Sequence, residues 1–115
     1  MVCGKLEIDI LNSFWNLTEQ NEDRDISIQD IVDDLSTNGI ERAYTTIKTV
    51  MDRLVEKNIL TRTKKGKKFS YETTKSRNET AHKAILKLAN TYFNDDLTLL
   101  HEAVQRVCSS SKMLV

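Results

Sequence analysis

A change of hydrophobic period in the middle of the chain constrains the fold more than any other feature. Apolar residues recur at helical spacing in two short segments, residues 27–36 and 43–58, and Asn38-Gly39 lies between them. An alternating pattern typical of β-strands follows directly, in residues 59–63 and 68–73. Two short helices joined by a tight turn and followed at once by a hairpin predict a winged helix-turn-helix.

The boundaries of the two helical segments carry suitable residues. Ser27 is a good N-cap and is followed three residues later by Asp30, a variant of the capping box. Gly39 supplies the left-handed turn that ends the first helix, and Asn58 is the expected C-cap of the second. The apolar stripes contain Ile28, Ile31, Val32 and Leu35 in the first helix, and Ile47, Val50, Met51, Leu54 and Val55 in the second.

The flanking regions complete a fold that is mainly α with a small β-hairpin. Residues 5–17 have a wide helical stripe, and the polar residues 18–25 predict a loop. Lys65-Gly66 is the expected hairpin turn. The helical period returns from Ser76 to Ser111, while the tail from residue 109 lacks a period and predicts a frayed end. We therefore expect a winged-helix domain over residues 1–75 and a C-terminal helical region over residues 76–115.

Positive and negative charges are segregated along a chain whose formal net charge is zero. Residues 1–41 contain two basic and ten acidic residues, whereas residues 42–77 contain eleven basic and three acidic residues. Residues 78–115 contain four of each. The basic block gives the molecule one face suited to a polyanion.

The second predicted helix has the residues that a DNA-reading helix needs. Threonine both donates and accepts hydrogen bonds, its methyl group packs on a thymine methyl, and lysine reaches guanine acceptors. A solvated amphipathic helix is the alternative, because polar faces are common. The candidate DNA-binding residues of this helix are Tyr44, Thr45, Thr46, Lys48, Thr49 and Arg53, of which Arg53 is better placed for phosphate.

The predicted hairpin concentrates basic residues around Gly66. Such a wing would flank the groove and neutralise backbone phosphates. Lysines also protect exposed edge strands from aggregation, but a short hairpin needs only one or two for that purpose. We therefore expect phosphate contact from Arg62, Lys64, Lys65, Lys67 and Lys68.

The run AYTTIKTVMDRLVEKNILTRTKKGKKFSYE resembles the penicillinase, methicillin-resistance and copper-transport repressors (the BlaI/MecI/CopY family). Their pattern is T-[IV]-x-T-[LIV]-x-x-R-L-x-x-K-G, followed by a strand and a wing that ends in an aromatic pair. The matching residues are Thr46, Ile47, Thr49, Val50, Arg53, Leu54 and Lys57, with Phe69 and Tyr71 in the wing and Trp15 in the first helix. The resemblance covers about residues 5–75, and Asn58 replaces the usual glycine.

This resemblance implies a homodimeric transcriptional repressor that binds a dyad operator in double-stranded DNA. The C-terminal helices would form the dimer, and their apolar stripe is larger than two helices need to fold back on a small domain. The candidate dimer-interface residues are Ile85, Leu88, Tyr92, Leu97, Leu100 and Val104.

The induction mechanisms of the family do not transfer to this chain. Copper-responsive members carry a Cys-x-Cys pair in the tail, whereas this tail has only Cys108. Members that a sensor protease inactivates are cut at an Asn-Phe bond, but here the order is Phe93-Asn94, and Asn90 precedes a threonine. The inducing signal, whether a protease or a metal, stays unknown.

Other classes of function find no support in the sequence. There is no phosphate-binding glycine loop, Gly-x-Ser-x-Gly or His-Glu-x-x-His motif, and His82 and His101 are isolated. We expect no enzyme, cofactor or metal site, and two reduced thiols at Cys3 and Cys108. Without a membrane span or signal peptide, a cytoplasmic protein is expected. A protein-interaction module and a transcriptional activator remain alternatives, because fold alone does not fix function.

Overall fold

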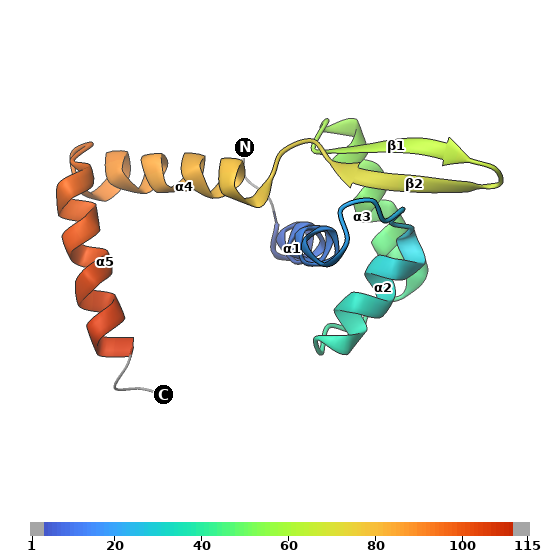
Figure 1. Cartoon of the computed structure of the whole chain (residues 1–115), viewed down its shortest axis with the longest axis horizontal. Coiled ribbons are helices and arrows are strands. Elements are labelled where there is room, and N and C mark those ends of the chain that lie inside the picture. The colour runs from blue at the N-terminus through green and yellow to red at the C-terminus, as the bar shows by residue number, and fades with distance from the viewer. Residues whose placement is uncertain (1–3, 112–115) are drawn as a thin grey trace. The chain divides into compact units, whose positions relative to one another are not determined.

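Three helices and a two-stranded hairpin form the first part of the chain, and two further helices follow them within residues 4–111 (Figure 1). These are the residues that the computed structural model describes. The chain divides into two compact units, with the boundary between Arg77 and Asn78. The elements are α1 (Lys5–Gln20), α2 (Ile28–Thr37), α3 (Tyr44–Glu56), β1 (Leu60–Lys65), β2 (Lys68–Thr73), α4 (Arg77–Tyr92) and α5 (Leu97–Ser111). The first unit is a winged helix, as the sequence predicts.

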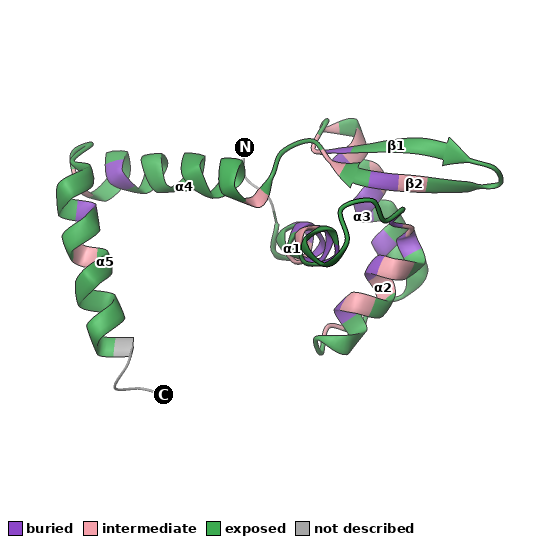
Figure 2. Cartoon of the chain, in the orientation of Figure 1, coloured by how far each residue is buried: buried purple, intermediate pink, exposed green. Residues whose placement is uncertain are grey.

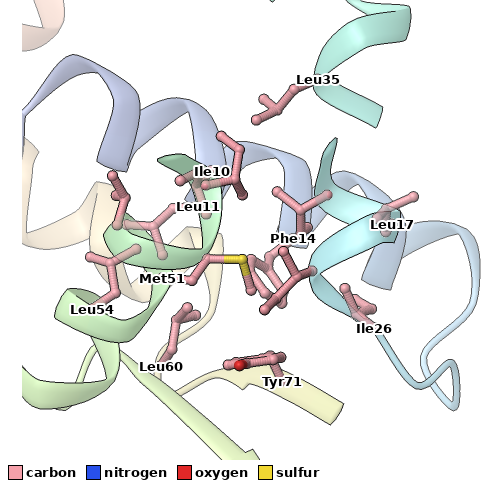
Figure 3. Close-up of a cluster of buried hydrophobic side chains, with 14 residues drawn as sticks. Ile10, Leu11, Phe14, Leu17, Ile26, Leu35, Met51, Leu54, Leu60 and Tyr71 are labelled. Carbon is pink, nitrogen blue, oxygen red and sulfur yellow. The ribbon is translucent and has the colours of Figure 1, made fainter. Parts of the chain in front are cut away.

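The core of the first unit lies where its three helices meet the start of the hairpin (Figure 3). Phe14 and Ile10 of α1 are fully buried, as is Met51 of α3. Burying apolar area of this kind is the main favourable contribution to folding. The other buried members of the cluster are Leu11, Leu17, Ile26, Ile28, Ile31, Leu35, Ile47, Val50, Leu54, Leu60 and Tyr71.

Helix α1 is longer than expected, because it continues to Gln20 where a loop was predicted from residue 18. Glu19 and Gln20 are good helix formers and extend the helix beyond its apolar stripe. Asn21 ends it in an extended conformation. The loop is therefore shorter, and its last part includes Ile26, whose carbonyl accepts a 2.8 Å hydrogen bond from the amide of Tyr71.

The predicted capping box at the start of α2 is present. The Ser27 hydroxyl accepts a hydrogen bond from the amide of Asp30, and the Asp30 carboxylate accepts one from the amide of Ser27. Gly39 has the left-handed conformation that was expected, with φ 82°. The amide of Ile40 then donates to the carbonyl of Leu35 at 2.8 Å, which closes the end of the helix.

The end of α3 lies one residue earlier than predicted. Lys57 is the C-cap, and Asn58 is the left-handed residue after it, with φ 62°. Asparagine tolerates this conformation better than most residues. The Lys57 ammonium also donates to the largely buried carboxylate of Glu7, with a 3.1 Å Nζ–Oε2 distance that joins α3 to α1.

The hairpin turn is shifted by one residue from the prediction. Lys65 pairs with Lys68 as the last rung of the antiparallel ladder, so that the two-residue turn is Gly66-Lys67. Gly66 has φ 66°, a left-handed conformation that glycine adopts at no steric cost. Strand β1 therefore extends to Lys65, and the basic residues lie on the strands as well as in the turn.

Arg77 joins the segment after the hairpin to α1. Its guanidinium lies 5.8 Å from the centre of the Trp15 ring and donates a 2.6 Å hydrogen bond to the side chain of Asn16. The Trp15 indole donates to the carbonyl of Lys75 at 3.2 Å. These contacts hold the last residues of the first unit against α1.

The second unit consists of α5 and of α4 after its first residue, and it is mostly exposed along both helices (Figure 2). Asp96 begins α5 by accepting hydrogen bonds from the amides of Thr98 and Leu99. Helix α5 continues to Ser111, so the expectation of a frayed end from residue 109 is wrong for residues 109–111. The rest of that predicted tail, like Cys3, lies outside the described residues.

None of the helices described between residues 4 and 111 combines the length and the apolar character needed to span a membrane.

Candidate nucleic-acid interface

Helix α3 separates its apolar and polar residues onto different sides. Ile47, Val50, Met51 and Leu54 are buried in the core of the first unit. All six predicted DNA-binding residues of this helix are exposed, which are Tyr44, Thr45, Thr46, Lys48, Thr49 and Arg53. The arrangement leaves this face free to contact a partner.

The start of α3 is open. Its N-cap is Ala43, whose methyl side chain cannot accept a hydrogen bond from the first amides of the helix. A helix leaves its first amide groups without backbone partners, and they carry a partial positive charge. The hydroxyl of Thr49 donates its hydrogen bond within the helix, to the carbonyl of Thr45 at 2.9 Å.

The wing places its basic residues in solvent. All five predicted residues, which are Arg62, Lys64, Lys65, Lys67 and Lys68, are exposed. They differ in their partners, because Lys65 forms a 3.0 Å ion pair with Asp25 of the α1–α2 loop. No ion pair involving Lys64, Lys67 or Lys68 is present in the part of the chain that the structure describes.

Asp25 ties the wing to the loop that precedes α2. The hydrogen bond and the charge of Lys65 lower the pKa of the Asp25 carboxyl, and Ser70 contributes a further hydrogen bond at 3.2 Å. Together with the neighbouring Ile26–Tyr71 bridge, these contacts support one edge of β2. Lys65 therefore has less free charge to offer a polyanion than its neighbours have.

An acidic residue connects α3 to the wing. Asp52 accepts from the Lys48 ammonium at 2.8 Å and from the Arg62 guanidinium at 3.3 Å. The hydrogen bond from Lys48 to Asp52 and the charge of that carboxylate raise the pKa of Lys48. Arg62 in turn lies over the Phe69 ring, with 4.8 Å between the guanidinium carbon and the ring centre.

A hollow of about 260 Å³ lies between the start of α2, the start of α3 and the wing. It brings together five of the predicted residues from α3 and the wing with residues at the start of α2 that the sequence did not indicate as part of a site. The capping box at Ser27 located the start of α2, but nothing in the sequence placed it beside the wing. The hollow is lined by Ser27, Ile28, Gln29, Tyr44, Lys48, Arg62, Lys67, Lys68, Phe69 and Tyr71.

The predicted dimer residues are in the second unit, and their exposure differs. Leu88 is 42% exposed, whereas Leu100 is only 6% exposed and so is already buried within one chain. The remaining four, which are Ile85, Tyr92, Leu97 and Val104, are 50% or more exposed. Cys108 is a free, exposed thiol.

No cluster of three or more His, Cys, Asp or Glu residues arranged to hold a metal ion occurs between residues 4 and 111.

Comparison with known proteins gives one family and one fold. The family model described as "Penicillinase repressor" matches residues 3–113. Among solved structures, that of the ferric uptake regulator from Francisella tularensis with iron is similar, with a TM-score of 0.53 and 22% sequence identity. That match covers 65% of this chain and 55% of the regulator's chain, and at this identity it supports the fold alone. A search of curated proteins gives no match.

Proposed function

Since the chain belongs to the penicillinase repressor family, we propose that it is a homodimeric repressor that binds a dyad operator in double-stranded DNA. The family and the winged-helix fold identify a DNA-binding transcriptional regulator. The proposal adds three points to this: the protein is a homodimer, its operator has dyad symmetry, and it represses transcription.

The observation that carries the proposal is the exposed polar face of α3 beside the unpaired lysines of the wing. In this arrangement α3 enters the major groove, where Thr46, Lys48 and Thr49 contact base edges. Arg53 and the wing lysines neutralise phosphates on either side of the groove. The open start of α3 adds amide groups that favour a nearby anion.

The second unit supports the dimer. Eight large apolar side chains on α4 and α5 are at least 42% exposed, which are Ile85, Leu86, Leu88, Tyr92, Leu97, Leu99, Val104 and Val107. Exposed apolar residues at this density favour burial against a second copy. Two copies would also place two recognition helices on one DNA duplex, which raises specificity beyond the few base pairs that one helix reads.

Selection of bound sequences from a random duplex library tests this function. We expect an enriched motif with two inverted half-sites, and binding that weakens steeply with salt. Transcription from a promoter that contains the motif then distinguishes repressor from activator. A protein-interaction module would show no enrichment and little salt dependence, and that result would overturn the proposal.

A further inference from the structure

Asp52 is an acidic residue between the candidate DNA-binding residues of α3 and those of the wing. It lies on α3 one turn after Lys48 and contacts the wing through Arg62. We infer that Asp52 is a specificity-determining residue, which withholds Lys48 and Arg62 from generic DNA phosphates. This inference rests on the proposed DNA-binding function.

The two ion pairs are accessible to a competing anion. The side chains of Lys48 and Arg62 are 52% and 41% exposed, and that of Asp52 is 33% exposed. Ion pairs with this exposure contribute little to stability and are screened by salt. In the free protein these ion pairs therefore keep Lys48 and Arg62 next to Asp52, but a competing anion can still displace Asp52.

Arg62 is restrained from a second side. Its guanidinium lies over the Phe69 ring while it donates to Asp52. These two contacts direct Arg62 toward α3, so that Lys48, Asp52 and Arg62 form a single group across the gap between helix and wing. The group carries one net positive charge, whereas the two cations alone would carry two.

Generic and specific DNA differ in what they offer this group. A phosphate gives Lys48 and Arg62 the kind of contact that the Asp52 carboxylate already provides, and leaves Asp52 unpaired beside a polyanion. A suitable base edge accepts hydrogen bonds from Lys48 only where the sequence places that base in reach of the helix, whereas phosphates lie at every step of the duplex. Asp52 therefore lowers affinity for generic DNA more than it lowers affinity for the correct operator.

Asp52→Asn is the test, with Glu56→Gln as its matched control. Glu56 is exposed one turn further along α3, and its substitution removes the same charge. No ion pair of Glu56 occurs among the described residues. Binding is measured to a labelled random-sequence duplex and to the selected operator over a range of salt concentrations, with circular dichroism as a check on folding.

We expect Asp52→Asn to tighten binding to the random duplex about tenfold, and to steepen the log–log salt slope by about 0.9 for each cation released. The preference for the operator should fall. Glu56→Gln should change affinity by less than about twofold at moderate salt, because it removes only distant repulsion. In the Asp52→Asn background, Lys48→Ala should reverse part of the gain on random DNA.

Other outcomes overturn the inference. Equal effects of Asp52→Asn and Glu56→Gln would mean that only overall charge matters. Weaker binding of random DNA by Asp52→Asn would mean that Asp52 orients the two cations for phosphate. In both cases the wild-type protein still binds DNA and the proposed function stands. Failure of the wild type to bind any duplex at low salt would overturn both proposals.

Discussion

At the scale of single residues, the starts of α2 and α3 show how side-chain chemistry decides what a helix can contact. Ser27 and Asp30 satisfy each other's amides, so the start of α2 is closed. Ala43 leaves the start of α3 without a side-chain cap. Helix α2 is thereby stabilised in the free protein, whereas α3 keeps its first amides available for an external acceptor.

Asp30→Asn should show that the closed start of α2 depends on a charge. Burial by itself raises the pKa of the Asp30 carboxyl, but hydrogen bonds from Ser27 and the charge of Arg24 outweigh it and lower the pKa below its ordinary value. A lowered folded-state pKa contributes stability that is present above the unfolded-state pKa and lost as the pH falls through the folded-state value. We expect a loss of about 1 kcal/mol at pH 7.

Urea unfolding at one protein concentration measures this effect at neutral pH and below the unfolded-state pKa. The difference between Asp30→Asn and the wild type should shrink in acid, where the wild-type carboxyl is also protonated. Asp33→Asn on the exposed side of α2 is the control and should change little at either pH. A loss for Asp30→Asn that does not depend on pH would contradict the ionic explanation.

Thr46→Ala tests base reading by a single residue. We expect a loss of about 1–3 kcal/mol of binding free energy on the selected operator and much less on random DNA, because only the operator offers the matching base edge. Competition binding with both duplexes gives the two values. Thr18→Ala, on the exposed side of α1, is the control and should leave both affinities unchanged. Equal losses of affinity of Thr46→Ala for the two duplexes would mean that Thr46 does not read bases.

At the scale of elements, the sequence predicts the helices and strands well and their ends less well. The stripe from Ile47 to Leu54 and the alternation around Tyr71 identify α3 and β2, because each period matches one regular structure. Helix α1 and strand β1 extend beyond their apolar patterns, since exposed residues such as Gln20 and Lys65 continue an element without a periodic signal. The contacts of Lys65 with Asp25, and of Asp52 with Arg62, join residues distant in the chain, and no local pattern encodes them.

We expect the four lysines of the wing to contribute unequally to DNA binding. Replacing Lys64, Lys67 and Lys68 together by alanine should weaken binding to the operator and to random DNA similarly, and should flatten the salt slope by about 0.9 for each lost phosphate contact. Lys65→Ala should affect the slope less than any single one of these substitutions, because Asp25 already pairs with Lys65. Salt titrations of the single and triple variants provide the comparison. A selective loss on the operator would show instead that the wing reads bases.

At the scale of the whole molecule, the two units have different chemistry. The first unit has a buried core and presents cations on α3 and the wing. The second unit has balanced charge and buries few of its apolar residues, Ala89 and Leu100 among the described ones. A unit with so little core in one chain is stabilised when it pairs with another copy, so folding and dimerisation of this part should be coupled.

Leu88→Asp tests this coupling at an exposed site. Leu100 is unsuitable, because it is already buried in one chain and an aspartate there would disturb folding directly. We expect Leu88→Asp to give monomers in sedimentation at micromolar concentration, since the new charge would be buried in the dimer without a partner. Lys87→Asp, at an exposed polar position beside it, should remain dimeric.

The monomeric Leu88→Asp variant should keep the helical signal of its winged-helix unit and its salt-dependent binding to random DNA. It should lose affinity for the dyad operator, because two recognition helices must bind there together. A wild-type protein that sediments as a monomer and binds a palindromic site without cooperativity would contradict the dimer.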